Sequence, residues 1–306
     1  MSGAILVENE LHHAYWRKKG QLTASLPTTI TYSGGTAATG HGFENCIDEN
    51  AGTTFKIANS TQAVITITLP RLLDMNGFCI YGHNLTKTQG ITIHYDDDTS
   101  GDVDTDFTDA GSIYTNTYKP ADNLYKPFGA MWTDGNLTVR RLKITTVNWT
   151  TESYISIMSA GMWVTSNIKI SAPFSPPSFT PYEATIKRNN NGNPLLSDTR
   201  KVPQKLNIKL NNFEESELED TTDVAFNTNI NGEQKYYSMI EYLGYYMPRF
   251  PFFVMYTQGV SGESDSLIAE DRNRLYYCTI DRSLRQPSYS SPTLLNWNIN
   301  AIGYIE

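Results

Sequence analysis

Hydrophobic and polar positions alternate in short runs along the first half of this chain, most clearly at residues 63–69. There the sequence Ala-Val-Ile-Thr-Ile-Thr-Leu places an apolar residue at every second position. A period of two predicts a strand with one buried face. The same kind of pattern predicts further strands at 78–81, 90–95, 139–146 and 154–164. Because no window here has a convincing period of 3.6, residues 27–170 predict an antiparallel β-sandwich.

The second half has a different pattern. Residues 171–181 contain four prolines, which cannot continue a strand ladder and favour an extended linker. Beyond them we predict strands at 182–187, 204–210, 252–256, 274–280 and 295–305, and helices at 213–220 and 232–247. The chain is therefore expected to be mainly β, with an N-terminal strand or arm at 1–26, a sandwich at 27–170, a Pro-rich linker at 171–181 and an α+β assembly domain at 182–306.

Composition and charge exclude several classes of partner. The formal net charge is −8, and charged residues make up only 18% of the chain. Phosphate binding needs clustered Lys and Arg, so we expect no nucleic-acid partner. No run approaches ~18 uninterrupted apolar residues, which argues against a membrane span, and the first residues lack the basic start of a secretory signal. Three widely spaced cysteines suit reduced, buried thiols.

The motifs of common catalytic sites are missing from the sequence. There is no His-Glu-x-x-His, Gly-x-Ser-x-Gly or Gly-x-x-x-x-Gly-Lys pattern. The run that starts at Asp102 fails as a calcium-binding EF-hand, because Phe107 and Ile113 replace the required Gly and Glu. A pair of glycosidase carboxylates stays open among 32 acidic residues. None of these acids lies in an evidently apolar setting, so we expect no enzyme activity.

Three stretches in order resemble one known family. Residues 44–55 (Glu-Asn-Cys-Ile-Asp-Glu-Asn-Ala-Gly-Thr-Thr-Phe), the strand at 63–69 and residues 77–85 (Gly-Phe-Cys-Ile-Tyr-Gly-His-Asn-Leu) are similar to the galactose-binding-like jelly rolls of the discoidin class. The strands at 139–144 and 156–163 fit the end of that fold. The resemblance implies a jelly-roll β-sandwich whose loops at one end bind glycan, lipid head group or protein.

The same resemblance implies a structural Ca²⁺ in the early loop, at Asp48 with Asn50 and Thr53 nearby. Oxygen ligands suit Ca²⁺, but six or more must converge. The alternative, which is the more common role, is that Asp48 caps a turn through backbone amides. For His83, in the Gly-His-Asn turn, a hydrogen bond to the backbone is favoured over ligand binding.

Aromatic residues in predicted loops are the candidates for contact with a glycan or a neighbouring subunit, because sugar rings stack on exposed Tyr and Trp. Four lie in the connection 100–137, and one lies in the turn after residue 147: Tyr114, Tyr118, Tyr125, Trp132 and Trp149. The alternative, that they cover the core or a neighbouring subunit, remains open and is favoured. Trp163 and Trp297 lie on predicted strands and are expected in the cores.

The second half resembles another class of proteins. Residues 188–195 (Arg-Asn-Asn-Asn-Gly-Asn-Pro-Leu), 249–254 (Arg-Phe-Pro-Phe-Phe-Val) and 275–278 (Leu-Tyr-Tyr-Cys) are similar to distal-tail proteins of tailed bacteriophages. This implies a virion structural protein, assembled in the host cytoplasm as a homo-oligomeric ring that links the tail tube and other tail proteins to the receptor-binding apparatus. Contact with host-surface glycan is compatible with it. A stand-alone lectin-like carbohydrate-binding module and a capsid decoration or head-fibre protein are the alternatives.

Overall fold

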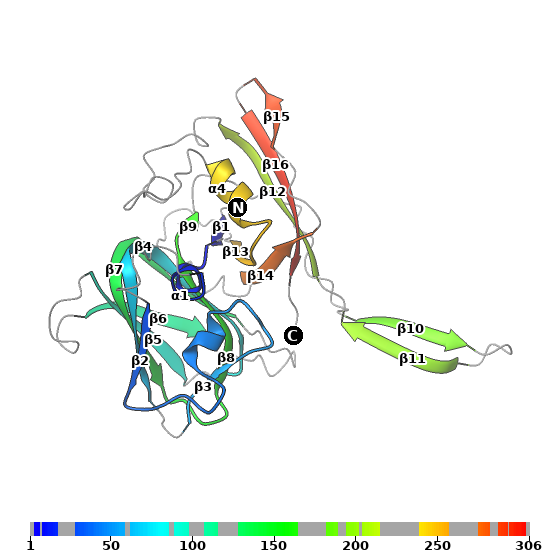
Figure 1. Cartoon of the computed structure of the whole chain (residues 1–306). Coiled ribbons are helices and arrows are strands. Elements are labelled where there is room, and N and C mark those ends of the chain that lie inside the picture. The colour runs from blue at the N-terminus through cyan, green and yellow to red at the C-terminus, as the bar shows by residue number, and fades with distance from the viewer. Residues whose placement is uncertain are drawn as a thin grey trace.

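A computed structural model of the chain shows a mainly β molecule with an N-terminal sandwich and a C-terminal α+β part (Figure 1). The structure describes the following residues: 3–6, 8–17, 28–58, 62–85, 89–97, 107–115, 128–164, 182–188, 194–201, 204–214, 239–256, 275–281, 287–292 and 294–303. No helix among them is both long and apolar enough to span a membrane.

The predicted sandwich is present and is built from seven antiparallel strands in one continuous hydrogen-bonded network. Their bounds are β2 (Thr29–Ser33), β3 (Phe55–Lys56), β4 (Val64–His83), β5 (Gly90–Asp96), β6 (Thr108–Thr115), β7 (Phe128–Val147) and β8 (Tyr154–Gly161). Each strand predicted in this half is found, although 63–69 and 78–81 belong to one long strand, β4.

The two long strands, β4 and β7, run through both layers of the sandwich. The first part of β4 pairs with β2 and with residues 141–145 of β7, whereas its last part pairs with β8 and with residues 128–132 of β7. The register shifts between Thr68 and Leu73, where the strand bends. This bend lets one strand cover two sides of a common core.

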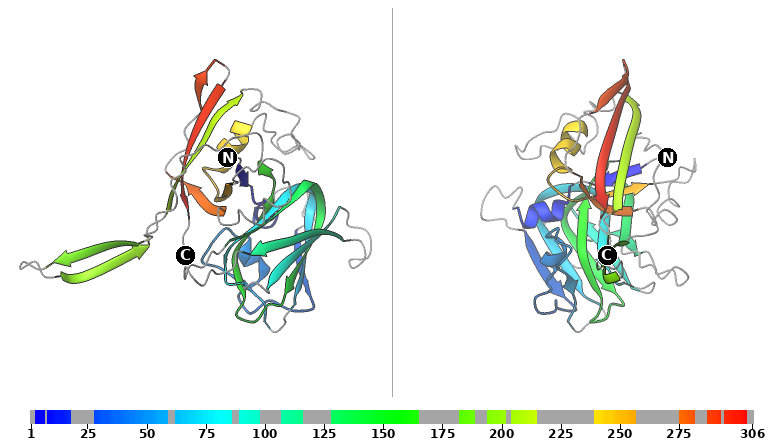
Figure 2. Two further views of the ribbon diagram at one scale, coloured as in Figure 1. Left: turned by 180° about the vertical axis from the view of Figure 1, so that it is seen from behind. Right: turned by 90° about the vertical axis from the view of Figure 1, so that its right-hand side faces the viewer.

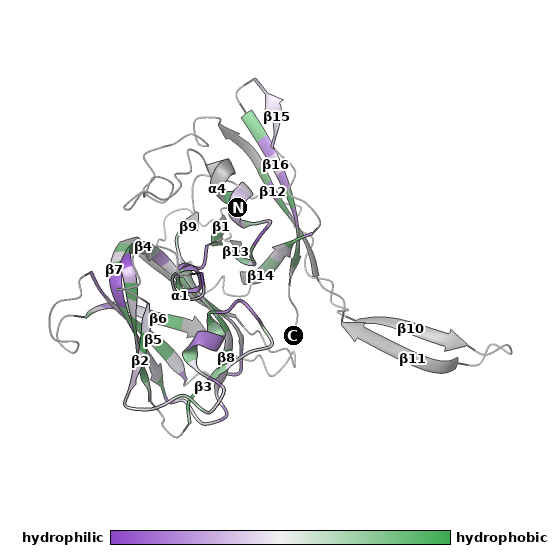
Figure 3. Ribbon diagram, viewed as in Figure 1, coloured by the Kyte–Doolittle hydropathy of each residue, from purple (hydrophilic) through white to green (hydrophobic). Residues whose placement is uncertain are grey.

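Alternation along β4 explains that core. Ile65, Ile67 and Leu69 are buried, while the threonines between them are half-buried. Green hydrophobic positions in Figure 3 follow the strands of this half. Asp96, at the start of an acidic stretch at 96–109, is buried, because its carboxylate accepts a 2.6 Å hydrogen bond from Nε of buried Arg141. Residues 98–106 of this stretch lie outside the described residues.

The second sheet joins segments from both ends of the chain. Its order is β12 (Gln204–Glu214), β16 (Leu294–Gly303), β14 (Leu275–Ile280), β13 (Phe252–Tyr256), β1 (Gly3–Leu6) and β9 (Trp163–Val164), with β15 (Ser288–Ser291) added to β16. The sequence predicted that the sandwich extends to residue 170. Residues 163–164 already belong to the second sheet, because they pair with β1 rather than with the sandwich. The N-terminal strand is thus part of the C-terminal core.

Packing of this second core follows the predicted pattern of its last strand. Trp297, Ile299 and Ala301 are buried, whereas Asn298 and Asn300 are exposed. Helix α4 (Met239–Tyr246) lies within the predicted helix 232–247 and ends before Pro248. The predicted helix 213–220 is wrong at its start, because Phe213 and Glu214 end strand β12 by pairing with β16. Its other residues and the predicted linker 171–181 lie outside the described part.

Strands β10 (Tyr182–Arg188) and β11 (Pro194–Lys201) form a two-stranded sheet of their own. Figure 1 and the left view of Figure 2 show this hairpin extending away from the rest of the molecule. Among the described strands, each pairs only with the other.

Candidate functional site

The loop of residues 41–54 carries the predicted oxygen ligands and is fixed to the sandwich by its buried side. It contains one turn of 3₁₀-helix, η1 (Phe43–Cys46), in which Phe43 and Cys46 are fully buried. The Phe43 amide donates a 2.6 Å hydrogen bond to the Tyr32 hydroxyl on β2. An apolar residue at each end of one helical turn therefore holds the loop on the core.

Trp149 packs against the loop through a chain of aromatic contacts. Its ring centroid lies 5.7 Å from that of Phe55, whose ring lies 5.4 Å from that of Phe43. Trp149 is fully buried, and its indole N–H donates a 2.9 Å hydrogen bond to the Gly90 carbonyl. This geometry corrects the prediction that Trp149 contacts a glycan, because a ring without exposed surface cannot stack on a sugar. The favoured alternative, that the ring covers the core, is confirmed for this residue.

Oxygen atoms do converge at Asp48, Asn50 and Thr53. The Thr53 hydroxyl lies 2.7 Å from the Asn50 carbonyl oxygen, 2.8 and 3.0 Å from the two Asp48 carboxylate oxygens, and 3.0 Å from the Asn45 carbonyl oxygen. A hydroxyl has one proton and can donate to only one of these acceptors at a time. The cluster is therefore rich in acceptors, which is the donor set that Ca²⁺ takes.

The capping alternative for Asp48 is also present, because its carboxylate accepts a 2.8 Å hydrogen bond from the Asn50 amide. This Asx turn leaves the second carboxylate oxygen facing Thr53. Within the described residues, no group of three or more His, Cys, Asp or Glu side chains could hold a metal. Any cation at this loop would thus depend on backbone and hydroxyl oxygens together with one carboxylate.

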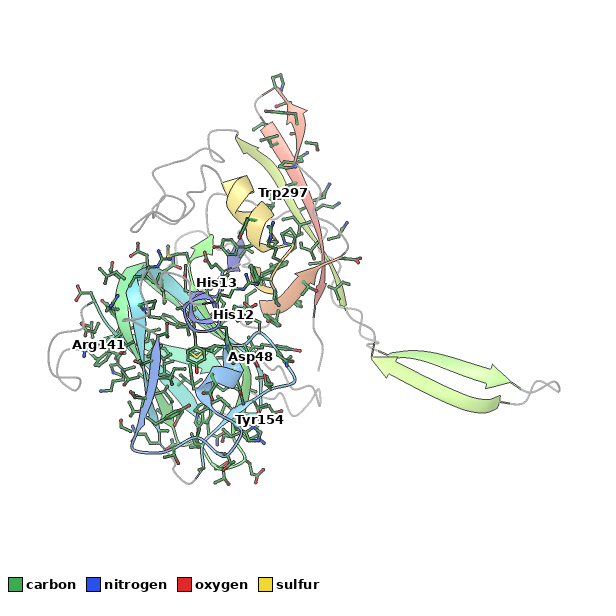
Figure 4. The ribbon with its side chains drawn as sticks, viewed as in Figure 1. His12, His13, Asp48, Arg141, Tyr154 and Trp297 are labelled. Atoms are coloured by element: carbon green, nitrogen blue, oxygen red, sulfur yellow. The ribbon has the colours of Figure 1, made fainter. Side chains whose placement is uncertain are left out.

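Glu49 follows the Asx turn in a constrained position. Its φ of 63° is in the left-handed region, which is uncommon for a residue with a side chain. Burial raises the pKa of Glu49 to about 8, although nearby Arg17 acts in the opposite direction. Its carboxylate lies 3.7 Å from Nε2 of His12. His12 belongs to helix α1 (Glu10–Tyr15), which packs against this loop (Figure 4).

Trp16, at the C-terminal end of α1, forms an exposed aromatic surface beside the loop. It is 47% exposed, although its indole N–H donates a 3.2 Å hydrogen bond to the Glu44 carbonyl. The Tyr15 ring meets it edge-on with centroids 5.3 Å apart. We call Trp16, Tyr15 and Glu44 the Trp16 platform. A ring that is exposed and held by its neighbours can present a flat apolar surface to a ligand.

The Glu44 carboxylate affects the tyrosines around this platform. Burial first, and the Glu44 charge second, raise the pKa of Tyr15. Burial likewise raises the pKa of Tyr32 to about 12, with a further contribution from Glu44. The Trp16 platform therefore combines an exposed indole, a phenol and a carboxylate in one place.

The sequence missed the Trp16 platform because residues 1–26 have no clear period. The adjacent aromatics at 15 and 16, followed by basic residues, are the only local signal for it. Its partner Glu44 lies 28 residues away, so the contact depends on how α1 packs.

Two of the other predicted contact residues lie in strands rather than in a loop. Tyr114 and Trp132 lie in strands β6 and β7, where their backbones pair with Ala130 and Gly77. The connection 100–137 is therefore partly strand, which corrects the prediction of a continuous loop. Tyr118 and Tyr125, and the side chains of Tyr114 and Trp132, lie outside the described part. For His83 the prediction is confirmed, because its Nδ1 accepts a 3.1 Å hydrogen bond from the Leu85 amide.

Helix α1 also connects the sandwich to the second core. On the sandwich side, the Asn9 side chain donates to the Met158 carbonyl at 3.1 Å. On the other side, the buried His13 ring meets Tyr246 and Phe250 edge-on, at 5.5 and 4.9 Å between centroids. Figure 4 shows His12 and His13 between the two β parts. The loop, the platform and the second core thus share one short helix.

Comparison with known proteins gives solved structures and no sequence relative. No protein-family model matches the chain, and no curated protein matches it. A GH29 fucosidase of Ruminococcus gnavus, in complex with fucose, is 16% identical over 49% of this chain and 27% of its own, with a TM-score of 0.34. This chain thus spans about a quarter of the fucosidase.

Two binding modules are matched over most of their own length. A family 32 carbohydrate-binding module of Clostridium perfringens, in complex with galactose, is 14% identical over 44% of this chain and 93% of its own, with a TM-score of 0.33. A chitosan-binding module of Paenibacillus sp. IK-5, in complex with chitotriose, is 16% identical over 46% of this chain and 100% of its own, with a TM-score of 0.34. Nothing in these comparisons indicates a phage tail-tip or baseplate protein.

Proposed function

We propose that this chain is a lectin-like, non-catalytic carbohydrate-binding protein whose glycan site is the Trp16 platform. The observation that carries the proposal is the exposure of Trp16 together with its anchoring through the indole N–H to Glu44. Among the described residues, the large hydrophobic side chains that are exposed are Trp16, Val147 and Tyr289. Of these, Trp16 alone is an indole, and its hydrogen-bond partner Glu44 carries a carboxylate.

The chemistry of the platform suits a sugar ring. The C–H face of a pyranose packs on an indole, and sugar hydroxyls can donate to a carboxylate such as that of Glu44. Because the hydrogen bond to the Glu44 carbonyl already fixes Trp16, little side-chain entropy is lost on binding. Binding without turnover agrees with the lack of a catalytic motif in the sequence.

A Ca²⁺ ion at Asp48, Asn50 and Thr53 is the second part of the proposal. The acceptor-rich cluster around the Thr53 hydroxyl supports it. The cluster shares the loop 41–54 with Glu44. An ion that holds this loop would therefore also hold the carboxylate of the platform.

The test is binding of purified protein to oligosaccharides by titration calorimetry. Fucose, galactose and chitotriose, the sugars in the complexes described above, are the first probes, followed by a wider glycan array. Trp16→Ala should reduce affinity for a bound glycan by about tenfold or more, since the stacking surface is lost. The matched control is Tyr289→Ala, which removes a 61%-exposed aromatic on β15. Equal affinity in Trp16→Ala and wild type would rule out the platform.

A second function is favoured by the isolated hairpin. A two-stranded hairpin is marginally stable by itself in water, yet β10 and β11 pair only with each other among the described strands. A neighbouring subunit would stabilise them. In this second proposal the chain is a ring-forming structural protein of a virion tail, assembled in the host cytoplasm with other tail proteins, and its glycan site contacts the host surface.

Light scattering after size exclusion distinguishes the two proposals. A closed oligomer that becomes monomeric when a short Gly-Ser linker replaces residues 182–201 would support the ring. A monomer at all concentrations, with glycan binding intact, would leave the carbohydrate-binding module as the function.

A further inference from the structure

We propose that a second surface, at His41, Lys56 and Tyr154, binds acidic saccharides through their carboxylates. This inference goes beyond the Trp16 platform and does not depend on it. The three residues come from the loop 41–54, from β3 and from the start of β8. We call them the Lys56 surface.

Backbone pairing places these three residues in one row. The Lys56 amide donates a 3.1 Å hydrogen bond to the His41 carbonyl, and Lys56 pairs directly with Tyr154 across β3 and β8. Directly opposed residues of antiparallel strands have their side chains on the same face. The row is thus built on paired strands and a hydrogen-bonded loop segment, which favours a defined geometry.

The Lys56 ammonium group is placed to meet an anion. It lies 5.7 Å from the centre of the Tyr154 ring. The ion pairs within the described residues are His12 with Glu49 and Arg141 with Asp96, so no described carboxylate neutralises Lys56. This cation lies beside an aromatic ring on a chain with a net charge of −8.

Hydrogen bonds also hold the other two residues of the surface, His41 through its side chain and Tyr154 through its backbone. Nδ1 of the His41 ring lies 2.8 Å from the Thr54 hydroxyl, so this contact does not use the other ring nitrogen, Nε2. The Tyr154 amide donates a 2.9 Å hydrogen bond to the side-chain oxygen of Asn84. Tyr154 and Lys56 are each half-buried, so part of each residue remains accessible.

These groups match the chemistry of a sugar acid. A uronic or sialic acid carries an apolar ring face and a carboxylate, which the Tyr154 ring and the Lys56 ammonium group can bind together. A neutral sugar would leave the cation without a partner. In the view of Figure 4, Asp48 lies between His12 and Tyr154.

The experiment uses the full chain and trigalacturonate, with the reduced, uncharged trisaccharide as the neutral probe, in titration calorimetry at two salt concentrations. Lys56→Gln should weaken trigalacturonate binding by about tenfold and remove most of its salt dependence, because one charge-assisted hydrogen bond is lost. Tyr154→Ala should weaken binding of both probes.

Lys143→Gln is the matched control, since Lys143 also lies over an aromatic ring, Phe107, at 5.4 Å. It should bind trigalacturonate like the wild type. Trp16→Ala should also leave trigalacturonate binding unchanged, which separates this surface from the platform. If wild type does not bind trigalacturonate, or if Lys56→Gln binds it as well as wild type at low salt, the Lys56 surface is ruled out, whatever the outcome for Trp16.

Discussion

The Tyr246 hydroxyl on α4 donates a 2.5 Å hydrogen bond to the carboxylate of Glu8, 238 residues earlier in the chain. Both side chains are almost fully buried. Glu8 immediately precedes the N-cap of α1, and Tyr246 ends α4. This hydrogen bond therefore fixes the start of the connecting helix to the second core. A buried carboxylate must keep its donors, because burial without them is costly.

Replacement of Tyr246 by Phe removes one donor to a buried carboxylate while it retains the ring. We expect a loss of about 1–3 kcal/mol in the free energy of unfolding, measured by urea denaturation. Tyr245→Phe is the control, because Tyr245 is half-buried and we expect a much smaller change. Equal effects of the two substitutions would show that the Glu8 contact contributes nothing specific.

Gly161 is required by close packing of β8 against the segment before α1. A Cβ atom added at Gly161 would overlap the backbone oxygen of Glu8, which cannot rotate away. Gly161→Ala should cost about 1–3 kcal/mol through overpacking. Gly90→Ala has open space around its Cβ and should be nearly neutral. The midpoints of thermal unfolding of both variants provide the comparison, and a neutral Gly161→Ala would contradict the close approach.

Calcium should stabilise the folded chain through the oxygen cluster. At a Ca²⁺ concentration about 100 times Kd, binding to the native state alone contributes about 2.7 kcal/mol, which appears as a higher Tm than in EDTA. Asp48→Ala should abolish the difference, because it removes both carboxylate oxygens. Asp97→Ala changes an exposed acid and should retain it. A Tm that is the same in Ca²⁺ and in EDTA would exclude the site.

Tyr32 should make stability fall at high pH. Its pKa in the folded protein is about 12, compared with 10.0 for an unperturbed tyrosine, because burial disfavours the phenolate. Between these values the unfolded chain has lost the proton and the native protein still holds it, so the free energy of unfolding decreases as pH rises from 10 to 12. The contribution is fully present below pH 10.

The Tyr32→Phe variant isolates this effect from other titrating groups. It loses the hydroxyl that accepts from the Phe43 amide, so it should be less stable than wild type at pH 8. The stability difference between the two proteins should then shrink between pH 10 and pH 12 in urea titrations. A difference that stays constant over this range would show that Tyr32 ionises normally in the native protein.

Local patterns were sufficient to predict most strands. Alternation at Ile65 and Ile67, and again at Trp297 and Ile299, correctly indicated which face is buried, because neighbouring positions of a strand point to opposite sides. The convergence of Asp48 and Thr53 was also predictable, since both residues belong to one short turn. The acidic composition of residues 213–220 wrongly indicated a helix at Phe213 and Glu214, where pairing with β16 continues strand β12.

The sequence by itself determined the β character of the chain, the buried face of its clearest strands and the oxygen-rich turn, because each depends on residues within a few positions of one another. Tertiary structure alone decided that β1 joins the C-terminal sheet and that Trp16 lies beside Glu44. These outcomes depend on contacts between distant segments. Such contacts are set by how whole faces pack, which no short stretch of sequence encodes.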